Sequence, residues 1–188
     1  SIQLCHPGSD TSARITGVPP VAPSAVVYPV FGDQPHVLAE EELPGIVAQF
    51  VAAAQRARRA GFDAVELHAA HGTLLCQFLS PFTNWRQDGY GGDTRRRSRL
   101  IVEVVAGIRS TLGRAFPVVV RLSAEEWLDG GTTIAESKAV AKLLQAAGAD
   151  AISVSGGHAV GKSAVQSVLA PLGYLTPLAA QIKRAVRL

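Results

Sequence analysis

Residues 62–99 read FDAVELHAAHGTLLCQFLSPFTNWRQDGYGGDTRRRSR, and this stretch indicates both the fold and the chemistry of the chain. Its first part, residues 63–67, alternates small and branched apolar side chains over the length of a buried strand. His68 and His71 follow directly and precede Gly72. A strand that stops at a His-x-x-His-Gly turn places two imidazoles on one short loop, where a ligand can reach both. The stretch therefore predicts a strand end that carries a binding site.

Strands and helices alternate along the rest of the chain, as hydrophobic periodicity and turn residues indicate. The strands are almost continuously apolar, which is typical of parallel sheets covered by helices. An open doubly wound sheet and a barrel of eight strand–helix units both fit this pattern. A long loop is expected at 9–35, with an extended piece at 26–28. The other expected strands are 2–6, 117–123 and 150–155, and the expected helices are 40–61, 94–112, 134–147 and 176–187.

The composition limits the class of protein. The chain has 188 residues, 47% of them hydrophobic, which suffices for one domain with a core. Its net charge of +3 is mild and predicts no nucleic-acid partner. No apolar run approaches the roughly 18 residues that span a bilayer, so no membrane partner is predicted either. Cys5 and Cys76 stand far apart in apolar settings, as reduced thiols of a cytoplasmic protein do. The chain lacks methionine, and Ser1 opens directly into a strand, so we expect a piece of a longer protein.

Arg121 is the most telling polar residue, because it lies inside an apolar strand. A buried guanidinium without a partner lowers the stability of the fold by roughly several kcal/mol, because its charge loses its hydration. An anionic or carbonyl-rich ligand would meet this need, and so would an internal salt bridge to Glu66 or Asp150. The sequence leaves both explanations open.

The stretch around the two histidines resembles the old yellow enzyme family of FMN-dependent NADH:flavin oxidoreductases, in its His-x-x-His branch. The resemblance extends over nearly the whole chain and is strongest in residues 62–99, through the histidine pair, Ser80-Pro81, Asn84, Arg86, Asp88 and Tyr90-Gly91-Gly92. It implies an α/β fold that is a partial (β/α)8 TIM barrel with about four β/α units, strands 3 to 6 of the family barrel. Residues 1–188 would then form a single domain, itself a fragment of the barrel.

The resemblance also implies roles for particular residues. His68 and His71 would hold the carbonyl or nitro oxygen of an activated alkene, a small-molecule substrate, and stabilise the charge that develops there. Gln3 and Arg121 would contact the flavin ring of FMN. NADH or NADPH would serve as reductant, and no metal is expected.

Four positions depart from the family pattern. Thr73 stands where a tyrosine usually protonates the substrate, and threonine is a much poorer acid at neutral pH. Ser9 replaces an arginine, and Arg95-Arg96 replace an acidic residue and an asparagine. The loops that bind the flavin phosphate in the family have no counterpart in this chain.

Two alternatives remain. Residues 156–163, GGHAVGKS, satisfy the phosphate-binding pattern G-x-x-x-x-G-K-S, which predicts a P-loop nucleotide-binding protein. The second is a truncated half-barrel that binds no flavin and pairs with another chain, as in a homo-oligomer, through its unpaired edge strands. A metal site at the histidine pair would need a third ligand, for which His6 is the candidate.

Overall fold

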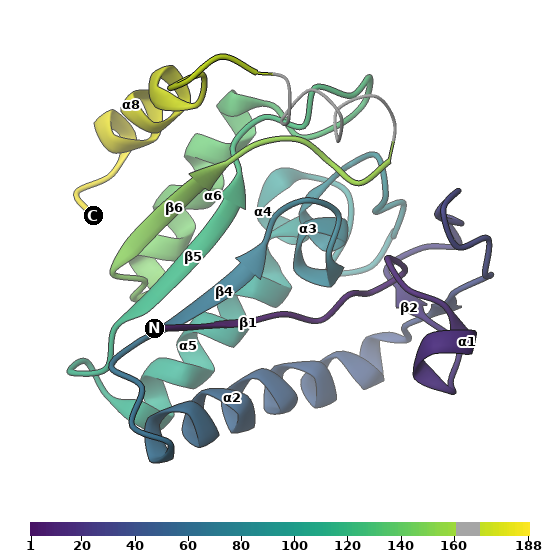
Figure 1. Ribbon diagram of the computed structural model, residues 1–188, viewed down its shortest axis with the longest axis horizontal. Coiled ribbons are helices and arrows are strands. Elements are labelled where there is room, and N and C mark those ends of the chain that lie inside the picture. The colour runs from purple at the N-terminus through teal and green to yellow at the C-terminus, as the bar shows by residue number, and fades with distance from the viewer. Residues whose placement is uncertain (161–169) are drawn as a thin grey trace.

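The computed structural model describes residues 1–160 and 170–188, and its centre is a parallel sheet of four strands. The strands are β1 (Ile2–Leu4), β4 (Val65–Ala69), β5 (Val118–Ser123) and β6 (Ala151–Ser155). They lie side by side in the order β1-β4-β5-β6 (Figure 1). Each strand of this sheet thus pairs with the next one along the chain, without the reversal of order that defines a doubly wound sheet. This is the arrangement of a barrel wall.

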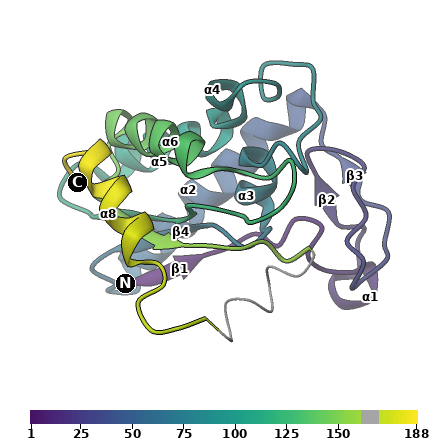
Figure 2. The same ribbon diagram turned by 90° about the horizontal axis from the view of Figure 1, so that it is seen from above.

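Three amphipathic helices cover one face of this sheet: α2 (Leu43–Arg59), α5 (Arg99–Leu112) and α6 (Ile134–Ala147) (Figure 2). Alternate strand residues point into the core between sheet and helices, because successive side chains of a strand face opposite ways. Val65, Leu67, Val118 and Val120 are each fully buried there. The C-terminal helix α8 (Thr176–Ala185) packs against α6. Among the described residues, no helix is long and apolar enough to cross a membrane.

The opposite face of the sheet carries polar side chains. Glu66 and His68 alternate with the buried residues of β4, and Arg121 does the same in β5. All three are only partly buried. This polar face is therefore the surface on which a ligand can meet the sheet.

The segment expected as a loop has some structure of its own. It contains α1 (Ala13–Thr16) and β2 (Val21–Ala22), and β2 pairs in parallel with β3 (His36–Val37). The extended piece expected at residues 26–28 is not a strand. A 3₁₀ turn at Glu40–Glu42 leads into α2.

Helix α3 (Leu74–Leu79) was not expected from the sequence. All six of its residues are buried. A helix without an exposed face shows no apolar–polar period, so its sequence carries no helical signature.

Several boundaries differ from the predicted ones. The second strand of the sheet lies two residues later than expected, at Val65–Ala69, the first ends at Leu4, and α8 ends at Ala185. The helix expected at 94–112 is two helices, α4 (Thr94–Arg97) and α5, which meet at Ser98. The contacts of Arg97 fix the position of this junction. Its buried side chain donates to the carbonyl oxygens of Leu79 and Gly92 and pairs with Glu136.

Candidate functional site at the carboxyl end of the sheet

The chain turns sharply after β4, and this turn carries the two histidines. His71 and Gly72 both adopt positive φ, 59° and 85°, which reverses the chain direction into α3. A Cβ on Gly72 would lie 2.8 Å from the Tyr28 hydroxyl and 2.9 Å from His158 Cε1, so only glycine fits there. The turn is thus shaped by a close approach from two distant parts of the chain.

Strand register brings the predicted site residues onto one face. Gln3 pairs with Glu66, and His68 pairs with Arg121. Register partners in parallel strands point the same way, so Gln3, His68 and Arg121 share the polar face. The His68 and His71 rings lie edge to face, with centroids 5.2 Å apart. All four residues predicted from the resemblance therefore lie at one region of the sheet; their roles stay predictions.

Arg121 has no ion pair among the described residues. Of the two candidate partners, Glu66 accepts a hydrogen bond from Gln3 Nε2 at 2.5 Å, and Asp150 pairs with Arg109. The salt-bridge explanation for Arg121 is therefore wrong. Its Nη2 donates only to Ser155 Oγ, at 3.4 Å, and its buried Nε has no hydrogen-bond partner in the described part of the chain.

This arginine fits a flavin ring. A buried N–H without an acceptor is costly and is rarely left unpaired in folded proteins. The carbonyl-rich, electron-accepting edge of an isoalloxazine would supply the acceptor that Nε lacks. Gln3, on the same face, keeps its amide oxygen unused in the described residues, because its recorded hydrogen bond uses only Nε2.

Both imidazoles are held neutral at physiological pH. Burial, and then the positive charges of Arg121 and His68, lower the pKa of His71 to about 4. Burial and Arg121 also lower the pKa of His68, against the opposing effect of Glu66. A neutral imidazole has one N–H to donate, so the pair can offer two hydrogen bonds to a ligand without carrying charge.

Thr73 cannot replace the missing tyrosine. Its hydroxyl is buried and lies 3.0 Å from the carbonyl oxygen of His68 and 3.1 Å from that of Ala70. Tyr28 is no better placed, because its hydroxyl donates to the Gly72 carbonyl oxygen at 2.9 Å. Burial also raises the pKa of Tyr28 well above its usual range. Both hydroxyls therefore stabilise the turn.

The sequence placed Ser155 at the end of an expected strand but did not predict three contacts that the structure shows at the turn. Ser155 Oγ lies 2.6 Å from His71 Nε2, and Ser123 Oγ accepts from the His71 backbone N–H at 3.0 Å. His158 packs behind the turn, with Nε2 3.4 Å from the Tyr28 hydroxyl. Serines at strand ends are common, and no local signal indicates that these two contact His71.

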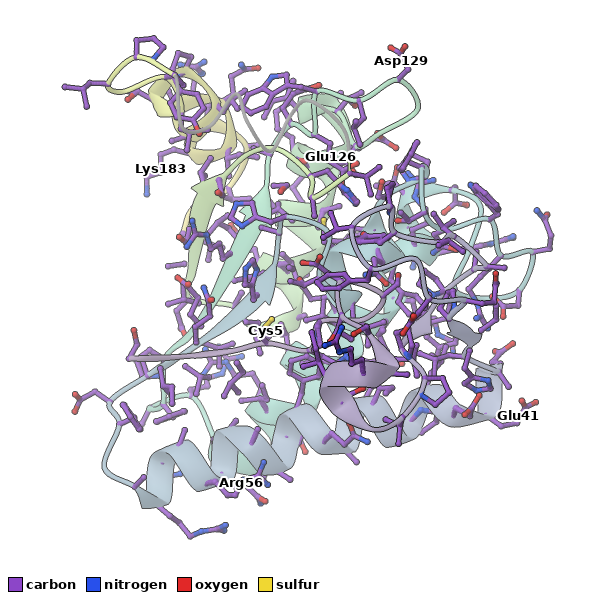
Figure 3. The ribbon with its side chains drawn as sticks, turned by 45° about the vertical axis from the view of Figure 1, so that its right-hand side comes forward. Cys5, Glu41, Arg56, Glu126, Asp129 and Lys183 are labelled. Carbon is purple, nitrogen blue, oxygen red and sulfur yellow. The ribbon has the colours of Figure 1, made fainter. Side chains whose placement is uncertain are left out.

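His6 does not join the histidine pair in a metal site. Among the described residues, the one group of three converging metal-type ligands is Cys76, Glu126 and His158, whose ligand atoms lie within 4.8 Å of one another. Glu126 lies on the loop after β5, at the upper end of the sheet in Figure 3. It accepts from Cys76 Sγ, Ser80 Oγ and the Thr132 backbone N–H, so Cys76 and Glu126 are partners in a hydrogen-bond network. The expected absence of a metal stays a prediction.

Fold and site together define a β/α-barrel protein whose ligand site lies at the carboxyl ends of its strands. The sequence model of the NADH:flavin oxidoreductase / NADH oxidase family matches residues 1–168. The chain belongs to this family, the old yellow enzyme family, whose cofactor is FMN and whose reductant is NADH or NADPH.

Curated relatives agree with this assignment. An NADH oxidase of Thermoanaerobacter brockii is 41% identical over 100% of this chain and 29% of its own length. An NADPH dehydrogenase of Listeria monocytogenes is 38% identical over 97% of this chain and 52% of its own length. The chain thus spans about a third to a half of the length of these relatives.

Solved structures agree as well. A 2-naphthoyl-CoA reductase in complex with 2-naphthoyl-CoA superposes with a TM-score of 0.90 at 28% identity, over 98% of this chain and 30% of its own. Morphinone reductase superposes with a TM-score of 0.78 at 30% identity, over 98% of this chain and 52% of its own. The four-stranded sheet is therefore part of a TIM barrel, as predicted.

The comparisons give no support to the P-loop alternative. Its lysine and serine, Lys162 and Ser163, lie outside the described residues, so the structure does not describe the proposed phosphate cradle.

Proposed function

We propose that this chain provides the flavin-ring and substrate-oxygen contacts of an FMN-dependent, NAD(P)H-linked ene-reductase of the old yellow enzyme type. The observation that carries the proposal is the convergence of an acceptor-deficient Arg121 and a neutral histidine pair on one face. When bound, FMN would pass a hydride from NADH or NADPH to the β-carbon of an activated alkene. Residues 1–188 would act as one domain within the barrel.

The residues of the chain would divide the remaining work. His68 and His71 would donate hydrogen bonds to the carbonyl or nitro oxygen of the substrate, which stabilises negative charge as it develops on that oxygen. Arg121 and Gln3 would hold the ring of FMN. Because Thr73 and Tyr28 are committed to backbone carbonyls, we propose water as the source of the proton for the α-carbon.

The test is flavin binding followed by its reduction. The protein with added FMN is expected to show a flavin absorbance spectrum that bleaches with NADH or NADPH and recovers with an enone. Arg121→Met is expected to weaken FMN binding by about 10- to 100-fold, since a charged hydrogen bond contributes about 1.5–3 kcal/mol. The exposed Arg114 gives the matched control Arg114→Met, which should bind FMN as the parent chain does. Equal FMN affinity in both variants would refute the role of Arg121.

A further inference from the structure

The hydrogen bonds of His68 identify its tautomer. The backbone N–H of Ala70 donates to His68 Nδ1 at 3.3 Å. A backbone N–H can only donate, so Nδ1 must be the unprotonated nitrogen of the neutral ring. The single ring proton of His68 therefore sits on Nε2, which has no recorded partner in the described part of the chain.

His71 meets a hydroxyl instead, which can donate or accept. Its Nε2 lies 2.6 Å from Ser155 Oγ. Arg121 Nη2 also donates to this oxygen, at 3.4 Å, and a guanidinium has no acceptor to offer in return. The Ser155 hydroxyl proton must therefore find another acceptor, and Ser155 is only 5% exposed to solvent.

His71 Nε2 is the one acceptor recorded for that proton among the described residues. The guanidinium on the same oxygen reinforces this direction, because a positive charge repels an N–H that points toward it. Ser155 thus donates to His71 Nε2, and the ring proton of His71 lies on Nδ1. The two rings would then expose different nitrogens, Nε2–H of His68 and Nδ1–H of His71.

We propose that Ser155 is a positioning residue that holds His71 in its Nδ1–H tautomer, so that the histidine pair presents two hydrogen-bond donors to the substrate oxygen. The inference deepens the proposed function and rests on it for the identity of the ligand. Without the serine hydroxyl, Nε2 loses its donor, and His71 is free to carry its proton there. One of the two N–H groups would then point back into the protein.

Long-range proton–nitrogen NMR spectra of the ¹⁵N-histidine-labelled chain test this assignment, because protonated and unprotonated ring nitrogens resonate far apart. Signals of His71 are assigned by their loss in His71→Gln. In the parent chain we expect opposite tautomers, Nε2–H for His68 and Nδ1–H for His71. Ser155→Ala should shift His71 toward Nε2–H and leave His68 unchanged, whereas Ser155→Thr, which keeps the hydroxyl, should preserve the parent pattern.

Ser153→Ala is the matched control, since Ser153 lies on the same face of β6 as Ser155 and is the register partner of Arg121 on β5. Its spectrum should match the parent. A parent chain with His71 in the Nε2–H tautomer would overturn the proposal, and so would a folded Ser155→Ala variant with an unchanged pattern. If Ser155→Ala does not fold, the parent and Ser155→Thr spectra decide.

The same variants separate this inference from the proposed function. With FMN bound, Ser155→Ala should lower kcat for enone reduction by about tenfold or more, as loss of an orienting contact does in other sites. If no FMN binds but the tautomers are as expected, the proposed function fails and the assignment of the ring protons stands.

Discussion

Protonation of His158 should make the fold sensitive to mild acid. This imidazole is only 1% exposed, and burial, followed by the charge of His71, lowers its pKa to about 4. In the unfolded chain its pKa is about 6.5. Above about pH 6.5 the ring is neutral in both states and costs nothing. As the pH falls, the unfolded chain takes up the proton first, so the free energy of unfolding decreases.

The size of the effect follows from the two pKa values. A difference of about 2.5 units corresponds to about 3 kcal/mol when the pH has fallen through the folded pKa, and to about 2 kcal/mol at about pH 5. His158→Gln removes the titrating group. The variant's free energy of unfolding should therefore change by about 2 kcal/mol less than that of the parent between about pH 7 and about pH 5.

Urea unfolding followed by circular dichroism at these two pH values measures the difference. His36→Gln is a suitable control, because His36 is exposed and its side chain pairs with Glu42. This control should keep the parent's pH dependence to within about 0.5 kcal/mol. If His158→Gln loses stability in acid as steeply as the parent does, the buried imidazole is not the source of the acid sensitivity, and the reasoning is refuted.

Two further substitutions test the supports of the site. Arg97→Met should destabilise the chain by about 3–5 kcal/mol in urea unfolding, because it leaves Glu136 and two carbonyl oxygens without their buried partner, whereas the exposed Arg96→Met should stay within about 0.5 kcal/mol. Equal stabilities would contradict the anchoring role. Gly72→Ala should cost about 1–3 kcal/mol in thermal unfolding, since it forces a Cβ against Tyr28 at positive φ. A parent-like Tm for this variant would show that the turn can relax.

Local pattern predicted most of the regular structure. The apolar spacing of α2, α5 and α6 was readable because each helix buries one face and exposes the other. The sheet strands were readable as short apolar runs between turns. Helix α3 was not, since it is buried on all sides and offers no contrast between faces. The junction at Ser98 was missed for another reason, because Arg97 is held there by residues from three other parts of the chain.

The candidate site was predictable by residue type but not by contact. His68 and His71 stand out as a pair at a strand end, and Arg121 stands out as a charge in an apolar strand. Their partners did not stand out. Ser155 and His158 lie more than 80 residues beyond the turn they contact. Ser155 stands at the end of an expected strand, but nothing in the immediate sequence of either residue indicates these contacts.

The sequence by itself determined the alternation of strands and helices and the family to which the chain belongs, because the first depends on the local spacing of apolar residues and the second on short motifs. The pattern of strands and helices left open whether the sheet is doubly wound or part of a barrel, although the family resemblance favoured the barrel, and it left open whether Arg121 is neutralised internally. Only the tertiary structure decided these points. Strand order and register are set by packing between distant segments. In that packing Glu66 accepts a hydrogen bond from Gln3, and Asp150 forms an ion pair with Arg109. Arg121 is thereby left facing the same surface as the histidines, with a donor still to satisfy.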